Sequence, residues 1–463
     1  MKPVYQMENS GISFFFNPES VAVVGATEEP GKISNIILRS LLRAGFKGKV
    51  YPVNPRYSSV LGMECLPSIE AIPEKADIAV FAIPAPAVPN ALKNAEGKIR
   101  GAIIVGGGFA ETGEAGSALE KEVREIAARA GIRIIGPNCM GIFDTASKLD
   151  TFFIPEDRIQ RPGKGGLSII SQSGSFAVTA MDELAADGIG VARVVSYGNK
   201  TDVDEADCLD FLADDSETKA VAAYIESVDD GRRFIEAASR CSANKPVMAV
   251  KVGKAGAGIT AARSHTGAIA GRYEIYRAAF KKAGVIELDG YEEFLAACKA
   301  FGMQGRAKGN RVMIITDGGG VGVGLSDACH ALGLDVAPLP EELSAKLKSE
   351  LPPYFAIGNP LDLTGSATDE SFALSLQKTM SGDHYDIAII AALWGPPALT
   401  DNLPAMLAQK PGFTEKPILI CTPGGEYSRQ RFKLFREVGL PVFGTPEAAV
   451  RAASVLARGA RRG

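Results

Sequence analysis

Short runs of β-branched residues alternate with longer amphipathic stretches along the whole chain, and this alternation limits its possible folds more than any other feature. The short runs have the length of buried strands and the longer stretches have helical spacing, which is the pattern of repeated β-α-β units. The sequence therefore predicts an α/β fold with parallel sheets. The strands expected in the first third of the chain are residues 20–24, 49–53, 78–82, 101–105 and 132–135.

Two interruptions divide the strand series. The chain has 463 residues, enough for about three domains of ordinary size. A joint rich in proline and glycine lies at 161–166, and a polar stretch lies at 305–310. New strands are expected after each, at 167–170, 191–195, 220–224 and 247–251 and then at 311–315, 387–391 and 418–421. We therefore expect three doubly wound domains in tandem, at 1–150, 163–303 and 309–463.

Composition excludes several classes of function. Lysine and arginine number 50 against 54 acidic residues, so no basic field is available to bind nucleic acid. The first residues do not resemble a signal peptide, and no apolar run reaches the ~18 residues that cross a bilayer. A cytoplasmic protein without a membrane partner is expected. The seven cysteines are scattered without a CxxC pair, which favours buried free thiols over disulfides or a metal site.

The first glycine turn follows the strand expected at 20–24. Gly25 and Gly31 are one residue too far apart for a GxxxxGK[ST] loop, and Ile33 stands where that loop needs a hydroxyl. Thr27 replaces the second glycine of a dinucleotide fingerprint, and no acid ends the next strand, so NAD binding is disfavoured. Two possibilities remain: an anion site at a helix start, or a tight connection that binds nothing.

A second turn opens the second domain. Ser171, Gln172, Ser173 and Gly174 follow a buried strand, and their hydroxyl groups suit a phosphate ligand. A serine that only caps the next helix explains the pattern equally well.

His265 differs from the other two histidines in its surroundings. It lies within residues 252–271, which include five glycines and directly follow the strand expected at 247–251. A neutral imidazole is nucleophilic near pH 7, and glycines permit movement, so the segment suits a carrier of a chemical group. An inert loop histidine is the alternative. Glu226, at the end of an earlier strand, is a candidate partner that could orient the ring.

Several motifs occur together in one order. They are VVGAT at 23–27, YPVNP at 51–55, IPA at 83–85, GPNCMG at 136–141, SQSG at 171–174, IE at 225–226 and SHTG at 264–267. In this order and spacing the chain resembles the α subunits of ADP-forming acyl-CoA synthetases, which are relatives of the succinyl-CoA synthetase α subunit.

The resemblance implies a CoA-binding Rossmann-like domain followed by two flavodoxin-like ligase-CoA domains. It implies that His265 carries a phosphoryl group, that Glu226 orients it, and that Ser171, Gln172, Ser173 and Gly174 face the phosphate. The residues that it implies for CoA are Gly25, Ala26, Thr27, Val53, Asn54, Pro55, Ile83, Pro84, Ala85, Val105, Gly106, Gly107 and Asn138.

The implied reaction interconverts acyl-CoA, ADP and phosphate with a carboxylic acid, CoA and ATP. Because no ATP-grasp region is recognisable, ADP or ATP with Mg²⁺ is expected mainly on a β subunit, in an α2β2 assembly. Residues 175–178 lack the tyrosine of succinyl-specific relatives, which disfavours a dicarboxylate. A short carboxylic acid is the substrate expected with acyl-CoA. A non-catalytic CoA-binding or acyl-CoA-binding regulator and a stand-alone oxidoreductase are the competing hypotheses.

Overall fold

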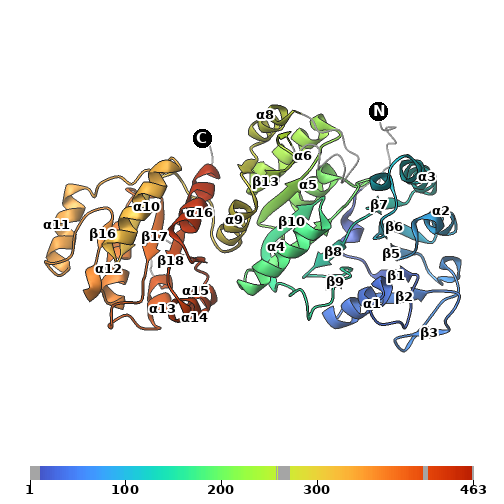
Figure 1. Cartoon of the computed structure of the whole chain (residues 1–463), viewed down its shortest axis with the longest axis horizontal. Helices are drawn as coiled ribbons and strands as arrows, with labels where there is room; N and C mark the ends of the chain where they lie inside the picture. The colour runs from blue at the N-terminus through green and yellow to red at the C-terminus, as the bar shows by residue number, and fades with distance from the viewer. Residues whose placement is uncertain (1–10, 257, 259–271, 410–414, 461–463) are drawn as a thin grey trace. The chain divides into compact units, whose positions relative to one another are not determined.

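The computed structural model describes residues 11–256, 258, 272–409 and 415–460. It divides into two compact units, one of residues 1–185 with 190–287 and one of residues 186–189 with 288–463. The first unit contains one parallel sheet, one mostly parallel sheet and a small hairpin, and the second unit contains one parallel sheet, so the expected α/β class is confirmed (Figure 1).

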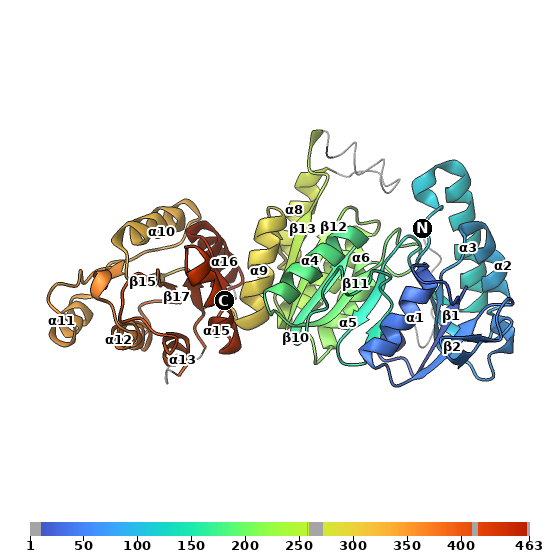
Figure 2. The same cartoon turned by 60° about the horizontal axis from the view of Figure 1, so that its bottom comes forward.

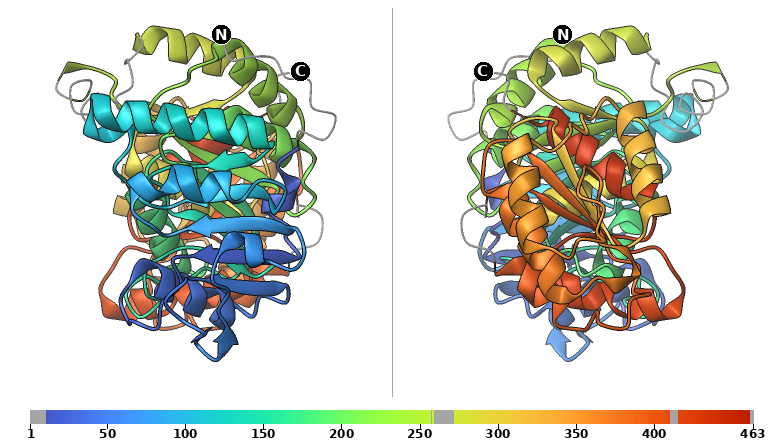
Figure 3. Two further views of the ribbon diagram at one scale, coloured as in Figure 1. Left: turned by 90° about the vertical axis from the view of Figure 1, so that its right-hand side faces the viewer. Right: turned by 90° about the vertical axis from the view of Figure 1, so that its left-hand side faces the viewer.

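The first sheet has five parallel strands in the order β2-β1-β5-β6-β7. Its strands are β1 (Ser20–Val24), β2 (Lys49–Val53), β5 (Ala76–Phe81), β6 (Ile99–Ile104) and β7 (Arg133–Ile135). Its helices are α1 (Ile33–Ala44), α2 (Val88–Lys93) and α3 (Glu114–Ala130). Right-handed crossovers place α1 on one face and α2 and α3 on the other, where α2 and α3 pack together (Figure 3, left). A small hairpin of β3 (Ser59–Val60) and β4 (Met63–Glu64) follows β2.

The second sheet has the order β14-β13-β12-β10-β11-β8-β9. Its parallel strands are β10 (Lys164–Ser171), β11 (Val191–Ser196), β12 (Ala220–Ile225), β13 (Val247–Lys251) and β14 (Ile286–Leu288). Its helices are α4 (Gly174–Ala186), α5 (Glu205–Asp214), α6 (Gly231–Asn244) and α8 (Tyr273–Ala283). The chain reverses direction across the sheet after β11, so α4 lies on the opposite face from α5 and α6, which pack together (Figure 2).

Two antiparallel strands join this second sheet although they precede the glycine-rich joint. β8 (Gly141–Asp144) pairs with β11, and β9 (Leu149–Asp150) pairs with β8. The sequence analysis placed residues up to 150 in the first domain, whereas the first sheet ends at β7. The physical reason is that β11 would otherwise be an open edge, and β8 satisfies its backbone groups.

The sheet of the second unit has the order β16-β15-β17-β18-β19 (Figure 3, right). Its strands are β15 (Val312–Thr316), β16 (Leu361–Asp362), β17 (Ile387–Ala391), β18 (Ile418–Cys421) and β19 (Val442–Phe443). Its helices are α9 (Tyr291–Met303), α10 (Gly319–Ala331), α11 (Glu341–Glu350), α12 (Asp369–Met380), α13 (Leu403–Ala408), α14 (Glu426–Gln430), α15 (Phe432–Glu437) and α16 (Pro446–Arg458). α9, which was expected at the end of the second domain, packs against α16.

The turns after β10 and β15 have the same construction. Ser171 Oγ donates to the Ser173 carbonyl and accepts from the Ser173 N–H, at 2.7 and 3.1 Å. Thr316 Oγ1 makes the same two bonds with Gly318, at 3.2 and 3.0 Å. The second and third domains therefore begin with similar strand-turn-helix units.

All seven cysteines are buried free thiols, as expected. Within the ranges that the structure describes, no helix combines the length and the apolar character needed to cross a bilayer.

Candidate active site

The residues expected to bind CoA gather at the carboxyl edge of the first sheet. The strand order reverses between β1 and β5, and ligands of doubly wound folds bind at such a reversal. Gly25 follows β1 with φ +91°, and a Cβ there would lie 2.7 Å from the Ala82 carbonyl oxygen and 2.8 Å from Ile83 Cγ2. Only glycine therefore allows the turn after β1 to lie this close to the chain after β5.

Polar side chains fix the shape of the turn after β1. Asn54, which follows β2, donates from Nδ2 to the Ala26 carbonyl oxygen at 2.7 Å. Thr27 Oγ1 lies 3.0 Å from the Tyr57 hydroxyl oxygen. Asn35, on α1, donates from Nδ2 to the Thr27 carbonyl oxygen at 2.9 Å. The expected residues after β1 and β2 thus form one connected edge.

The remaining expected residues continue this edge. Val53 and Pro55 flank Asn54, Pro84 follows Ile83, and Ala85 opens the 3-10 helix η3 (Ala85–Ala87). Val105, Gly106 and Gly107 follow β6. Asn138, in the loop after β7, has φ +56° and donates its backbone N–H to the Gly106 carbonyl oxygen at 3.0 Å. The structure therefore brings the expected residues of five strand ends to one side of the sheet.

The serine turn lies at the corresponding reversal of the second sheet, between β10 and β12. Ser173 Oγ accepts from the Phe176 N–H at 3.3 Å, so Ser173 caps α4, as one of the two alternatives for this turn anticipated. This cap leaves room for an anion, because the first turn of a helix has more unsatisfied N–H groups than one side chain can bind. Gly174 cannot be replaced freely, since a Cβ there would lie 2.8 Å from Met140 Cγ.

Glu226 lies directly beside the serine turn. It follows β12, and its side chain is buried. Gln172 Oε1 accepts from the backbone N–H groups of Glu226 at 2.5 Å and of Ser227 at 2.9 Å. The Gln172 N–H in turn donates to the Tyr224 carbonyl oxygen at 3.3 Å. The serine turn and Glu226 therefore lie side by side, and the Gln172 side chain holds the backbone at Glu226.

Burial shifts the pKa values of two neighbours of Glu226. Burial raises the pKa of Tyr224 above its ordinary value, and the nearby Glu226 carboxylate raises it further. Lys251 ends β13, and burial lowers its pKa to about 8, although Glu226 opposes this shift. Lys251 Nζ lies 4.6 Å from the centre of the Tyr276 ring. Glu226 thus stands beside a cation that loses its proton more readily than an exposed lysine.

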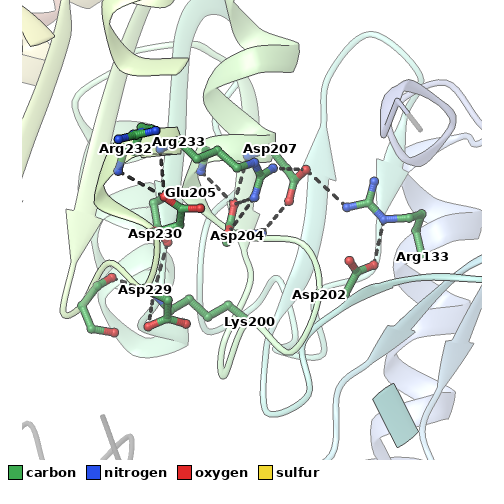
Figure 4. Close-up of polar contacts among 12 residues, drawn as sticks. Arg133, Lys200, Asp202, Asp204, Glu205, Asp207, Asp229, Asp230, Arg232 and Arg233 are labelled. Atoms are coloured by element: carbon green, nitrogen blue, oxygen red, sulfur yellow. Dashed lines mark hydrogen bonds and ion pairs between the residues drawn. The ribbon is translucent and has the colours of Figure 1, made fainter. Parts of the chain in front are cut away.

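Sequence reasoning missed a lysine that holds the segment after Glu226. Lys200 lies in the connection between β11 and α5, and its side chain is buried. Its Nζ donates to the Ser227 carbonyl oxygen at 2.7 Å and lies 3.4 Å from Glu205 Oε2 and 3.5 Å from Asp229 Oδ1 (Figure 4). No local sequence pattern marks such a residue. Its partners are a distant backbone carbonyl group and two carboxylates that belong to no motif.

His265, expected to carry the phosphoryl group, lies outside the described residues. The strand that leads to its segment, β13, pairs with β12, with Lys251 opposite Ile225. The chain that leads to His265 therefore leaves the sheet next to Glu226.

Three family models match the chain in succession. A CoA binding domain matches residues 19–145, a succinyl-CoA ligase like flavodoxin domain matches residues 164–301, and a ligase-CoA domain matches residues 312–419. Their order is the order of the three sheets.

Relatives match over nearly the whole chain. The α subunit of acetate–CoA ligase [ADP-forming] II of Pyrococcus furiosus is 38% identical over 457 residues, which cover 97% of this chain and 98% of that subunit. Acetate–CoA ligase [ADP-forming] I of Archaeoglobus fulgidus is 39% identical over 96% of this chain, which spans only 63% of that longer relative.

A solved structure has the same fold. The acetyl-coenzyme A synthetase 1 of Ca. Korarchaeum cryptofilum, in complex with phosphate and ADP, aligns with a TM-score of 0.88 and 33% identity, over 97% of this chain and 96% of that one. With the family models and the identity to full-length α subunits, this shows that the chain belongs to the family of ADP-forming acetate–CoA ligase α subunits.

Proposed function

We propose that this chain is the α subunit of a nucleoside-diphosphate-forming acyl-CoA synthetase, with His265 as its phosphoryl carrier. The reaction interconverts acyl-CoA, ADP and phosphate with a carboxylic acid, CoA and ATP. One observation carries the proposal: the serine turn at 171–174 and Glu226 meet at the strand reversal of the second sheet, beside the strand that leads to His265.

The proposed chemistry has three steps. A phosphate oxygen attacks the thioester carbon of acyl-CoA, the C–S bond breaks, and CoA leaves as its thiol with acyl phosphate as the other product. An imidazole nitrogen of His265 then attacks phosphorus, and the P–O bond to the acyl group breaks to release the carboxylate. Phosphohistidine finally gives the phosphoryl group to ADP. Glu226 would hold the other ring nitrogen, which leaves the reacting nitrogen with its lone pair.

The first sheet would bind CoA. Its carboxyl edge is formed by Gly25–Thr27, Val53–Pro55, Ile83–Ala85 and the loop after β6, which lie at the usual ligand position of a doubly wound domain. The turn after β1 leads into α1, whose N-terminus favours a phosphate of CoA. The acyl group would be a short carboxylic acid. A dicarboxylate is disfavoured, because Phe176 rather than a tyrosine follows the serine turn.

The nucleotide step would need a second polypeptide. The P. furiosus relatives are named as α subunits, which supports a β-subunit partner. We propose that this partner supplies an ATP-grasp domain with Mg²⁺ and that the two chains form a cytoplasmic α2β2 assembly.

Labelling the isolated chain tests this proposal. With acetyl-CoA and ³²P-phosphate, the wild-type protein should acquire label that is lost in acid and kept in base, as phosphohistidine is. A non-catalytic CoA-binding regulator, the competing hypothesis, would bind CoA without acquiring label. Binding without label from a panel of short acyl-CoA compounds would therefore contradict the proposed function and favour the regulator.

A further inference from the structure

The connection between β11 and α5 contacts both candidate half-sites. These are the proposed CoA edge of the first sheet and the serine turn with Glu226 in the second sheet. Residues 197–204, here termed the bridging turn, leave the second sheet beside the serine turn, because the Tyr197 N–H donates to the Ser171 carbonyl oxygen at 3.0 Å. The turn then follows β7 and the loop after it, in the first domain. Its consecutive contacts there are Asn199 N–H to Pro137 O at 2.9 Å, Thr201 N–H to Gly136 O at 3.0 Å and Val203 N–H to Ile134 O at 3.0 Å.

The backbone of the bridging turn is shaped for this close approach. Gly198 has φ +54°, and a Cβ there would lie 2.3 Å from the carbonyl oxygens of both Pro137 and Asn138. Lys200 also has a left-handed backbone, with φ +53°. Such a conformation is unfavourable for a residue with a side chain, so it requires compensating contacts.

Asn199 reaches the loop after β6, where CoA is proposed to bind. Its Nδ2 donates to Glu111 Oε2 at 2.7 Å and to Glu120 Oε2 at 3.0 Å. Glu111 Oε1 accepts from the backbone N–H groups of Gly108 at 2.5 Å and Phe109 at 3.1 Å, and Glu120 Oε2 accepts from the Ala110 N–H at 3.1 Å. One amide group therefore fixes both carboxylates that hold this loop.

Lys200, the next residue, reaches the other half-site. Its ammonium donates to the Ser227 carbonyl oxygen at 2.7 Å, and Gln172 Oε1 accepts from the Ser227 N–H at 2.9 Å. Ser227, the residue directly after Glu226, is thus held at both its backbone N–H and its carbonyl oxygen. Asp229, on the same segment, lies 3.5 Å from Lys200 Nζ (Figure 4).

Ion pairs fix the end of the bridging turn to both domains. Arg133, on β7, contacts Asp202 at 2.8 Å and Asp207, on α5, at 3.3 Å. Arg233, on α6, contacts Asp204 at 2.9 Å and also pairs with Asp207 (Figure 4). Movement of the turn would disturb the first and second domains together.

We propose that the bridging turn positions both half-sites from adjacent residues, with Asn199 as a positioning residue for CoA and Lys200 as a positioning residue for Glu226. This inference rests on the proposed function and extends it. It predicts that the two adjacent residues control different steps: Asn199 the binding of CoA, and Lys200 the phosphoryl transfer.

Two variants of the full-length chain separate these roles. Asn199→Ala should raise the Kd of CoA about tenfold in calorimetry, while labelling from saturating acetyl-CoA and ³²P-phosphate stays within about threefold of wild type. Lys200→Met keeps a side chain at the left-handed position and removes only the ammonium group. It should leave the Kd of CoA unchanged and slow labelling at least tenfold.

Lys245→Met is the matched control. Like Lys200, Lys245 donates from Nζ to backbone carbonyl oxygens, in this case those of Leu212 and Asp215. It precedes β13 and so lies at the amino edge of the second sheet, opposite the site. This variant should lose stability without affecting either readout. If Asn199→Ala does not fold, Glu111→Gln changes the carboxylate that accepts the Asn199 hydrogen bond and holds the loop after β6. This variant should also weaken CoA binding.

Two results would overturn the inference in distinguishable ways. If wild type is labelled but both variants change CoA binding and labelling in parallel, as a general loss of folded protein would, the bridging turn is only structural. A wild-type chain that binds CoA but acquires no label would overturn the proposed function itself, and this inference with it.

Discussion

Glu205 shows how strongly burial shifts the pKa of a residue beside the site. It lies at the start of α5, and burial raises its pKa to about 7 although Lys200 lies nearby. Because its folded-state pKa exceeds its ordinary value of 4.5, the stability linked to it is fully present below pH 4.5. That stability is lost as the pH rises through 7.

Glu205→Gln should therefore become more stable than wild type as the pH rises. The difference in unfolding free energy should grow between pH 4.5 and 7, where the wild-type carboxyl loses its proton, and reach roughly 1–3 kcal/mol above that range. Urea denaturation of both proteins at pH 5 and pH 8 measures it. A variant that is less stable than wild type at pH 8 would show that the Lys200 contact outweighs the cost of burial.

Glu226 offers a second test at this scale. Gln172 binds the backbone N–H of Glu226 and not its carboxylate, so Glu226→Gln should keep the local fold. The neutral amide stabilises a positive imidazole poorly, and labelling from acetyl-CoA and phosphate should fall by about 10- to 100-fold. The Kd of CoA serves as the internal control, since the first sheet is unchanged. Labelling at the wild-type rate would exclude Glu226 from phosphoryl transfer.

Among the larger elements, the turn after β1 depends on the absence of a side chain. Gly25 and Gly31 both have positive φ, +91° and +82°, but only a Cβ at Gly25 would meet other atoms within 4 Å. The two glycines therefore separate the cost of a left-handed backbone from the cost of close contact.

Gly25→Ala should destabilise the protein by about 2–4 kcal/mol and weaken CoA binding, because Ile83 and the chain after β5 must move. Gly31→Ala should cost only about 1–2 kcal/mol and leave the Kd of CoA unchanged. Denaturation and calorimetry of the two variants measure both quantities. Equal effects on CoA binding would contradict the placement of the nucleotide at the β1–β5 reversal.

The sequence predicted the parallel strands better than the antiparallel strands that pair at the edge of the second sheet. β1, β10 and β15 were expected from buried apolar runs. The residues after β1 and β10 were expected at the site, because ligands bind at strand ends. β8 and β9 were not expected in the second sheet, since an antiparallel edge strand is chosen by the open edge that it covers. The roles of Asn199 and Lys200 were missed because contacts with distant carbonyls and carboxylates leave no periodic signal.

At the scale of the whole molecule, the proposed function places CoA binding and phosphoryl transfer on different sheets of the first unit. The edge of the first sheet would hold CoA, and the edge of the second would hold phosphate and face His265. The bridging turn joins these edges through hydrogen bonds on both sides. Because the two edges belong to different sheets, the two functions should be separable by mutation although both lie in one compact unit.

His265→Ala tests the central claim most directly. The wild-type chain and the variant would each be incubated with acetyl-CoA and ³²P-phosphate, the label would be mapped by mass spectrometry, and the Kd of CoA would be measured for both. The account predicts acid-labile phosphate on His265 in wild type, no label in the variant, and the same Kd of CoA in both. Undiminished label in the variant, or phosphate mapped to another residue, would contradict it.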